Sequence, residues 1–310
     1  RRAPMILIAI VGPTAVGKTE IAVRLAQEFR GEIVSADSRQ IYRGMDIATA
    51  KPTAEEMARV PHHLVDIVNP DEGFTLAEYQ RRAYAAIDEI ASRGRQPLLV
   101  GGTGLYVRSV VEGLQIPRVA PNAALRESLE RAEAADLYAR LEHLDPDAAA
   151  RILPGNTRRI IRALEVIHAT GEPISRQQTR RPPPYPVVMI GLTMPREELY
   201  GRVDRRIDRM LEHGLIDEVR ELVEHGYGFD LPSMTSLGYR EIGQYLQSQI
   251  SLEEAIRLFK SNTRKFIRHQ YNWFRPTDPR IRWFDRSVPD EERKVRQFAA
   301  TSLERETGER

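Results

Sequence analysis

The segment Gly12–Thr19 limits the possible folds of this chain more than any other, because it matches the pattern G-x4-G-K-[ST]. The apolar run Met5–Val11 comes directly before it, and a helical pattern with Ile21, Leu25 and Phe29 on one face follows. A strand, a glycine-rich turn and a helix in this order form a phosphate-binding loop. We therefore expect an α/β fold, with a P-loop-type parallel sheet wound by helices.

The chemistry of this loop follows from its residue types. Glycines let backbone N–H groups curl around phosphate oxygens, the Lys18 ammonium adds positive charge, and the Thr19 hydroxyl is placed to ligate Mg²⁺. The loop is expected to bind a diphosphate or triphosphate, with Mg²⁺ as cofactor and Thr19 as metal ligand. Its predicted phosphate-binding residues are Gly12, Pro13, Thr14, Ala15, Val16, Gly17, Lys18 and Thr19.

The remaining apolar runs predict the rest of the sheet and an insertion. The expected strands are Met5–Val11, Glu32–Ala36, His63–Val68, Pro97–Gly101 and Val187–Thr193. After Gly113 only helical periodicity is found until a proline-rich stretch at residues 181–186. Three parts are therefore predicted: residues 1–117 as the first part of the P-loop core, 118–186 as a helical insertion domain, and 187–310 as the second part of the core with a helical, basic C-terminal region.

The C-terminal third is predicted to be helical and strongly basic. Its expected helices are Arg196–His213, Ile216–His225, Tyr239–Leu246 and Leu252–Phe274. Residues 257–286 contain nine Lys or Arg against Asp278 and Asp285, a local charge of +7 in a chain whose net charge is only +2. Five of these cations share one side of the last helix, namely Arg257, Lys260, Arg264, Lys265 and Arg268. Such a face indicates contact with a polyanion.

Two candidate groups follow strands of the expected sheet. Asp37 comes directly after Glu32–Ala36, where its carboxylate could accept a proton or hold a metal, or could simply cap the next turn. Thr103, in a glycine turn after Pro97–Gly101, could donate its hydroxyl into the same cleft or serve only the turn. The strand Pro97–Gly101 lacks the carboxylate that usually holds metal in nucleoside triphosphatases, which favours a phosphate used as a leaving group over ATP hydrolysis.

Composition excludes several classes of protein. The chain has no Cys, which rules out disulfides and thiolate metal sites and fits a cytoplasmic location. Its longest apolar run has only seven residues, so we expect no membrane span. The seven His show no metal-ligand spacing and are interpreted as structural. No coiled-coil seam is found, and a monomer is expected.

Seven motifs in order resemble one known family. They are Gly12–Thr19, Asp37–Ile47 with Thr49–Pro52, Gly101–Tyr106, Arg159 with Arg162–Glu165, Leu237–Arg240, Thr263–Arg264 and Trp273–Arg275. Together they closely resemble the bacterial tRNA dimethylallyltransferases, also called tRNA isopentenyltransferases. The resemblance runs from Met5 to about Trp283.

This resemblance implies a reaction and a set of site residues. Dimethylallyl diphosphate would be the donor, and N6 of the adenosine 3′-adjacent to the anticodon in the tRNA anticodon stem-loop would be the acceptor. By resemblance the catalytic residues would be Asp37 as the base, Lys18, Thr103 and, beside the diphosphate, Arg240. The tRNA-binding residues would be Asp37, Ser38, Arg39, Gln40, Thr103, Arg126, Arg158, Arg159, Ile160, Ile161 and Arg162, to which the basic helix adds Arg264 and Arg268.

Three other functions remain compatible with the residues. A small-molecule kinase would use ATP at the loop, with residues 176–181 as a lid. A binding module would sense a nucleotide such as ATP and bind RNA without changing it. A prenyltransferase for free adenine nucleotides would use the same pocket but would need neither the insertion nor the basic helix.

Overall fold

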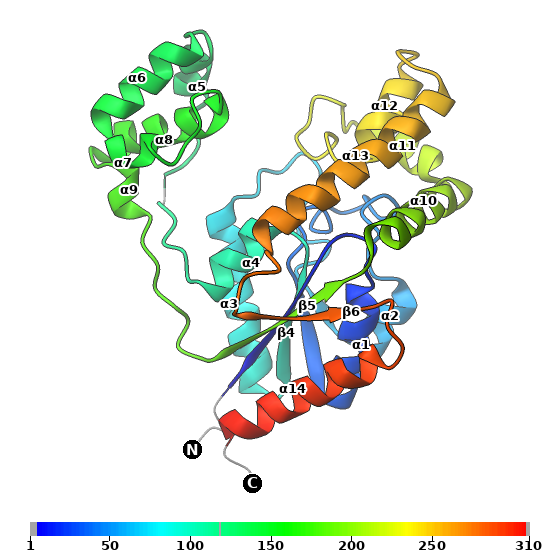
Figure 1. Cartoon of the computed structure of the whole chain (residues 1–310). Helices are drawn as coiled ribbons and strands as arrows, with labels where there is room; N and C mark the ends of the chain where they lie inside the picture. The colour runs from blue at the N-terminus through cyan, green and yellow to red at the C-terminus, as the bar shows by residue number, and fades with distance from the viewer. Residues whose placement is uncertain (1–4, 118, 308–310) are drawn as a thin grey trace. The chain divides into compact units, whose positions relative to one another are not determined.

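The computed structural model describes residues 5–117 and 119–307. The strands of these residues form a six-stranded sheet in which all neighbours are parallel, in the order β3-β2-β4-β1-β5-β6 (Figure 1). The strands are β1 (Leu7–Val11), β2 (Gly31–Ser35), β3 (His62–His63), β4 (Gln96–Gly101), β5 (Val187–Thr193) and β6 (Ile281–Asp285). The expected α/β fold with a parallel sheet is confirmed.

Helices cover both faces of the sheet, as the alternation of side chains along β1 requires. Ile8 and Ile10 belong to one buried cluster, and Ala9 and Val11 belong to another on the opposite face. The first cluster includes residues of α1 (Lys18–Glu28) and α14 (Glu291–Thr307), and the second includes residues of α3 (Leu76–Ser92) and α4 (Gly104–Val111). Central strand β1 is buried along its whole length, which fixes the position of the loop that follows it.

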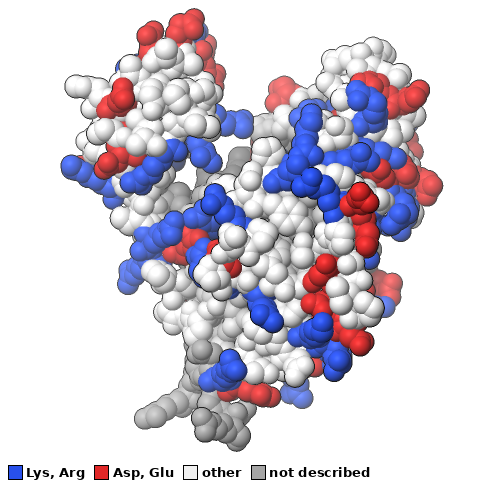
Figure 2. Space-filling view, in the orientation of Figure 1, with Lys and Arg blue, Asp and Glu red and all other residues white. Residues whose placement is uncertain are grey.

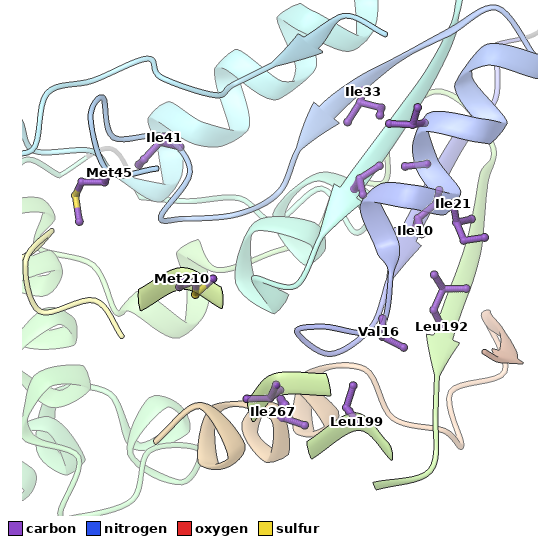
Figure 3. Close-up of a cluster of buried hydrophobic side chains, with 14 of the residues drawn as sticks. Ile10, Val16, Ile21, Ile33, Ile41, Met45, Leu192, Leu199, Met210 and Ile267 are labelled. Atoms are coloured by element: carbon purple, nitrogen blue, oxygen red, sulfur yellow. The ribbon is translucent and has the colours of Figure 1, made fainter. Parts of the chain in front are cut away.

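The predicted C-terminal helices are present, and two of them, α10 and α13, share a buried cluster with the phosphate loop. They are α10 (Arg196–Glu212), α11 (Leu215–Glu224), α12 (Tyr239–Leu246) and α13 (Leu252–Trp273). Val16, in the middle of the loop, is fully buried in the cluster that contains Leu192 of β5, Leu199 of α10 and Ile267 of α13 (Figure 3). The Val16 side chain therefore fixes the loop to the core, and the backbone N–H groups of the loop are not needed for this attachment.

The structure differs from the predicted secondary structure in three respects. The expected strand His63–Val68 is reduced to His62–His63, because Leu64 and Asp66 adopt positive φ angles of 64° and 55° that an extended strand cannot contain. The last third is not purely helical, since β6 adds an edge strand parallel to β5. The short helices α2 (Ala54–Arg59) and α4 were not predicted.

The helical insertion forms a compact unit of its own, residues Glu112–Pro183. The predicted start of the insertion, residue 118, lies outside the described residues. Its helices are α5 (Ala123–Glu130), α6 (Ala134–Leu144), α7 (Pro146–Ala149), α8 (Thr157–Thr170) and α9 (Ile174–Gln177). Leu137, Leu141 and Ile160 lie in its buried core. At its base the chain leaves and returns side by side, since the Arg181 N–H donates to the Gly113 carbonyl at 2.8 Å.

Candidate active site

The loops that follow β1, β2 and β4 line a single cavity of about 950 Å³ in the core unit. Because carboxyl ends of parallel strands meet at one edge of a sheet, these loops come together although they are far apart in the sequence. Helices α10 and α13 supply the other walls. The cavity contacts the predicted residues Thr14, Ala15, Gly17, Lys18, Thr19, Asp37, Ser38, Arg39, Gln40, Thr103 and Arg240.

Two glycines give the phosphate loop its shape. Gly12 has a φ of 148°, and a side chain there would lie 2.4 Å from the Leu192 carbonyl oxygen of β5. Gly17 has a φ of 97° and caps the start of helix α1, whose first residues line the cavity, as the predicted anion site requires. The Lys18 ammonium donates to the Pro13 carbonyl at 2.8 Å, so it folds back over the loop.

Two cations of the cavity, Lys18 and Arg206, lie close enough for their charges to influence one another. Burial lowers the pKa of Lys18 to about 8, with a contribution from nearby Arg206, while the negative charge of Asp37 opposes the shift. Burial also lowers the pKa of Arg206 on α10, again against the effect of Asp37. The Arg206 side chain has no hydrogen bond and no ion pair with any described residue, so its guanidinium remains available to an anion. Sequence reasoning missed Arg206, because α10 mixes Arg and Asp along its length.

Asp37 caps the next turn with one carboxylate oxygen, and its predicted role as a base stays a prediction. Its Oδ1 accepts a hydrogen bond from the Arg39 N–H at 2.8 Å, which is the turn-capping role. No donor among residues 5–117 and 119–307 reaches Oδ2, and the residue lines the cavity with Lys18. The cap fixes the direction of the carboxylate, and the second oxygen remains an acceptor for a proton.

The neighbours of Asp37 mostly hold the loop itself. Thr103 accepts from the Ser38 N–H at 3.0 Å through Oγ1, which ties the β4 loop to the β2 loop. The Gln40 side chain accepts from the Ser35 hydroxyl at 3.1 Å and donates to the Ala50 carbonyl at 3.1 Å. The Arg39 guanidinium donates to the Pro232 carbonyl at 3.2 Å. All four residues line the cavity, but their polar groups already have protein partners.

Arg240, predicted to lie beside the diphosphate, pairs with a carboxylate in this structure. Its Nε donates to Oε1 of Glu241 at 3.1 Å, and Glu241 itself is fully buried. The same Glu241 accepts from the Gly238 N–H at 2.8 Å and from Asn262 at 2.9 Å. Arg240 lines the cavity, and its assignment to the diphosphate stays a prediction.

The basic face expected on α13 is partly neutralised by other elements. Lys260 pairs with Asp208 at 2.6 Å and Arg264 pairs with Asp204, both on α10, while Arg257 pairs with Glu254 of its own first turn. In Figure 2 acidic atoms accordingly lie beside the basic atoms in the region of α10–α13. The sequence of α13 has no acid between Arg257 and Arg275, as noted above, but carboxylates of α10 neutralise two of its cations.

The part of α13 that stays free faces the cavity. Lys265, Phe266 and His269 are exposed and line its rim, and Phe266 is 41% exposed. Arg268 is exposed and donates to the Tyr200 hydroxyl at 3.3 Å. An aromatic ring between cations is typical of a surface that binds single-stranded nucleic acid. This part of α13 is therefore the better candidate for RNA contact than Arg264.

In the insertion, Glu165 joins two of the predicted tRNA-binding arginines. Its buried carboxylate accepts from Arg126 at 2.8 and 2.9 Å and from Arg162 at 2.5 Å. Arg158 and Arg159 are exposed at the start of α8. Ile160 and Ile161 are buried in the core of the insertion, so their predicted contact with tRNA is corrected: these side chains hold α8 in place.

The Glu165 cluster gives a pH-dependent prediction. Hydrogen bonds from two arginines and from the Asn122 N–H lower the pKa of Glu165 to about 2, although burial opposes the shift. A depressed pKa stabilises the fold above the unfolded-state value near 4.5, and this stabilisation is lost as the pH falls toward 2. We expect Glu165→Gln to destabilise the insertion at pH 7, by about 1–3 kcal/mol, and to match the wild type near pH 2.

Hydrogen exchange of peptides from α5 and α8 measures this difference, since it reports local opening within the full chain. Glu172→Gln, at an exposed position of the same unit, is the matched control and should change little at either pH. An equal destabilisation by Glu165→Gln at both pH values would show that its charge is unimportant.

Among the described residues no cluster of three or more His, Asp or Glu side chains could hold a metal ion. In the same part of the chain, no helix has the length and apolarity needed to cross a membrane.

His62, interpreted above as structural, lines the cavity, and its Nε2 is buried without a partner. Its pKa is lowered, mainly by burial.

A family model described as IPP transferase matches residues 40–277, more than half of the chain. The chain belongs to the IPP transferase family. Relatives in this family include the tRNA dimethylallyltransferase of Roseiflexus sp. strain RS-1, 60% identical over 87% of this chain and 90% of that protein. The tRNA dimethylallyltransferase of Thermomicrobium roseum is 48% identical over 98% of this chain and 93% of that protein.

Solved structures from the IPP transferase family share the fold. The full-length tRNA isopentenylpyrophosphate transferase of Bacillus halodurans superposes with a TM-score of 0.74 at 45% identity, covering 97% of this chain and 98% of that one. A eukaryotic dimethylallyltransferase acting on tRNA gives a TM-score of 0.84 at 27% identity, covering 96% and 79%. The similarity therefore includes both the core and the insertion.

Proposed function

We propose that this protein transfers the dimethylallyl group of dimethylallyl diphosphate to N6 of the adenosine 3′-adjacent to the anticodon in tRNA and releases diphosphate. Family membership supports this reaction, and the proposal depends most on one observation in the cavity. A carboxylate with a free oxygen, Asp37, lines the same cavity as the anion site at Lys18. A prenyl transfer to an amine needs these two groups close together, one for the leaving group and one for the proton.

The donor diphosphate would lie on the phosphate loop. The N–H groups at the start of α1, the Lys18 ammonium and the Arg206 guanidinium would bind its oxygens. Negative charge increases on this group as the bond to the dimethylallyl carbon breaks, so donors fixed in advance favour the transition state over the ground state. The diphosphate would also keep Lys18 protonated, since its negative charge raises the pKa that burial lowers.

Mg²⁺ would fit this site as a partner of the diphosphate and not as an ion held by protein alone. The Thr19 hydroxyl lines the cavity next to Lys18, and no cluster of three carboxylates is found among the described residues. Mg²⁺ commonly binds through one or two protein groups together with substrate phosphates. When bound, it would neutralise charge on the leaving diphosphate.

Asp37 would act as the base. The lone pair of N6 forms the new bond to the dimethylallyl carbon, the electron pair of the broken carbon–oxygen bond leaves with diphosphate, and the N6 proton passes to Oδ2 of Asp37. The adenine must leave its stack to enter the cavity, and an anticodon loop offers unpaired bases for this. Lys265, Phe266 and His269 at the rim would contact the loop, and Arg158 and Arg159 of the insertion would bind phosphates.

One chain supplies every group named in this mechanism, which supports a monomer. The proposal includes tRNA as the partner and the cytoplasm as the location. Incubation of the protein with radiolabelled dimethylallyl diphosphate, Mg²⁺ and an unmodified tRNA transcript should label the RNA. Nucleoside mass analysis should locate the label on the adenosine 3′ of the anticodon. A transcript with guanosine at that position is the matched control and should stay unlabelled.

Each alternative function predicts a different result in this experiment. Consumption of ATP without RNA would favour a kinase. Salt-dependent RNA binding without labelling would favour a binding module. Labelling of free adenosine monophosphate at the rate of tRNA would favour a nucleotide prenyltransferase.

A further inference from the structure

Gln270, in the last turn of α13, is a buried residue that forms hydrogen bonds with two loops of the cavity. The residue is 4% exposed. Its Oε1 accepts a hydrogen bond from the Thr14 N–H of the phosphate loop at 2.8 Å, and its Nε2 donates to the Gly102 carbonyl of the β4 loop at 3.1 Å. A single carboxamide thus uses its acceptor on one loop and its donor on the other.

The space around this carboxamide is closely fitted. A side chain at Gly102 would place its Cβ 2.3 Å from Nε2 of Gln270 and would have to displace the carboxamide from its present position. The next residue, Thr103, accepts from the Ser38 N–H at 3.0 Å. A continuous set of contacts therefore runs from Thr14 through Gln270 and Thr103 to the residue beside Asp37.

The hydrogen bond to Thr14 lies next to a strained position of the phosphate loop. Ala15, the next residue, has a φ of 67°, a left-handed conformation that is unfavourable for alanine. Because the Thr14 N–H is bonded to Gln270, this amide fixes the shape of the loop and does not bind phosphate. Gln270 thus supports the loop directly beside a residue in an unfavourable conformation.

We propose that Gln270 is a positioning residue, which sets the phosphate loop relative to the loop of Asp37 by holding Thr14 and Gly102. This inference rests on the proposed function, in which those loops carry the donor and the base. Gln270 contacts neither substrate; it acts through the two backbone groups. A small displacement between donor and base lowers the rate strongly, by up to about 10²-fold for 1 Å.

Two variants separate this role from simple packing. Gln270→Glu has the same shape, but the ionised carboxylate cannot donate to the Gly102 carbonyl, whereas the protonated form can. Burial raises the pKa of such a carboxyl, so lowering the pH should restore the donor. We expect kcat of Gln270→Glu to be about 10- to 100-fold below wild type at pH 8 and to approach it at pH 6. Gln270→Leu should be equally slow at both pH values.

The controls keep this test independent of folding and of the reaction. Gln249→Glu, at an exposed position after α12, should follow the wild type at both pH values. Affinity for inorganic diphosphate, measured by calorimetry, should weaken about tenfold in Gln270→Leu, and in Gln270→Glu at pH 8 only. Thermal unfolding shows whether each variant is folded at the assay temperature.

The outcomes decide the two proposals separately. If the wild type binds diphosphate but labels no tRNA, the proposed function fails, and the diphosphate affinities still decide the role of Gln270. If folded Gln270→Leu keeps both kcat and diphosphate affinity within threefold of wild type, the positioning role is overturned. The same follows if Gln270→Glu shows no recovery at pH 6; should that variant not fold, Gln270→Leu alone decides.

Discussion

Asp37→Asn should lower kcat for dimethylallyl transfer by about 10²–10⁴-fold, the usual effect of removing a general base. The substitution preserves shape, because an Asn side-chain oxygen can still accept from the Arg39 N–H that Asp37 Oδ1 caps. What it removes is the free oxygen that would take the N6 proton. Rates with saturating donor and tRNA at pH 7 measure this effect.

Binding measurements separate a lost base from a damaged site. The affinities of Asp37→Asn for tRNA and for inorganic diphosphate should stay within a few-fold of wild type. Asp71→Asn, at an exposed position, is the matched control and should leave kcat unchanged. If Asp37→Asn turns over at more than a tenth of the wild-type rate, Asp37 is not the base.

Arg206→Gln should reduce kcat/KM for dimethylallyl diphosphate by about 10²–10³-fold, the range found when one donor to a developing negative charge is removed. Arg206 is a cavity cation whose side chain has no partner among the described residues, so an anion would not have to displace a carboxylate from it. The affinity of Arg206→Gln for inorganic diphosphate should fall by a similar factor. Its affinity for tRNA, measured without donor, should change less than threefold.

The matched control for this variant lies on the neighbouring helix. Arg220 is exposed on α11 and pairs with Asp217 at 2.7 Å, so Arg220→Gln removes the same charge from the protein away from the cavity. If the two variants bind diphosphate equally well, Arg206 has no role in donor binding. Arg240→Gln then becomes the informative variant, because Arg240 is the other arginine assigned to the diphosphate.

The phosphate loop and its surrounding strand and helix were predictable because every signal was local. An apolar run, two glycines and an amphipathic pattern occupy adjacent positions between Met5 and Phe29. The insertion was also predictable, since a long helical interval interrupts an α/β pattern. Strand β6 was missed because Arg280 and Arg282 flank its first residue, so its short apolar alternation does not resemble a buried strand.

The charges of α13 could not be interpreted from its own sequence. Asp204 and Asp208 are four residues apart on α10, and Arg264 and Lys260 are four apart on α13. The matching spacing exists in the sequence, but only the packing of the two helices pairs them. The same dependence on packing hid Arg206 and Gln270, whose roles arise from what faces them and not from any pattern along the chain.

The paired backbone at the base of the insertion has a consequence for the architecture of this enzyme family. Because Gly113 and Arg181 are joined by a hydrogen bond, the intervening residues could be excised and the ends closed by a tight connection. The truncated polypeptide would keep an uninterrupted sheet and all the groups assigned to the allylic substrate. The chemistry would then be separable from the share of RNA recognition that the insertion contributes, while the RNA contacts assigned to α13 would remain with the core.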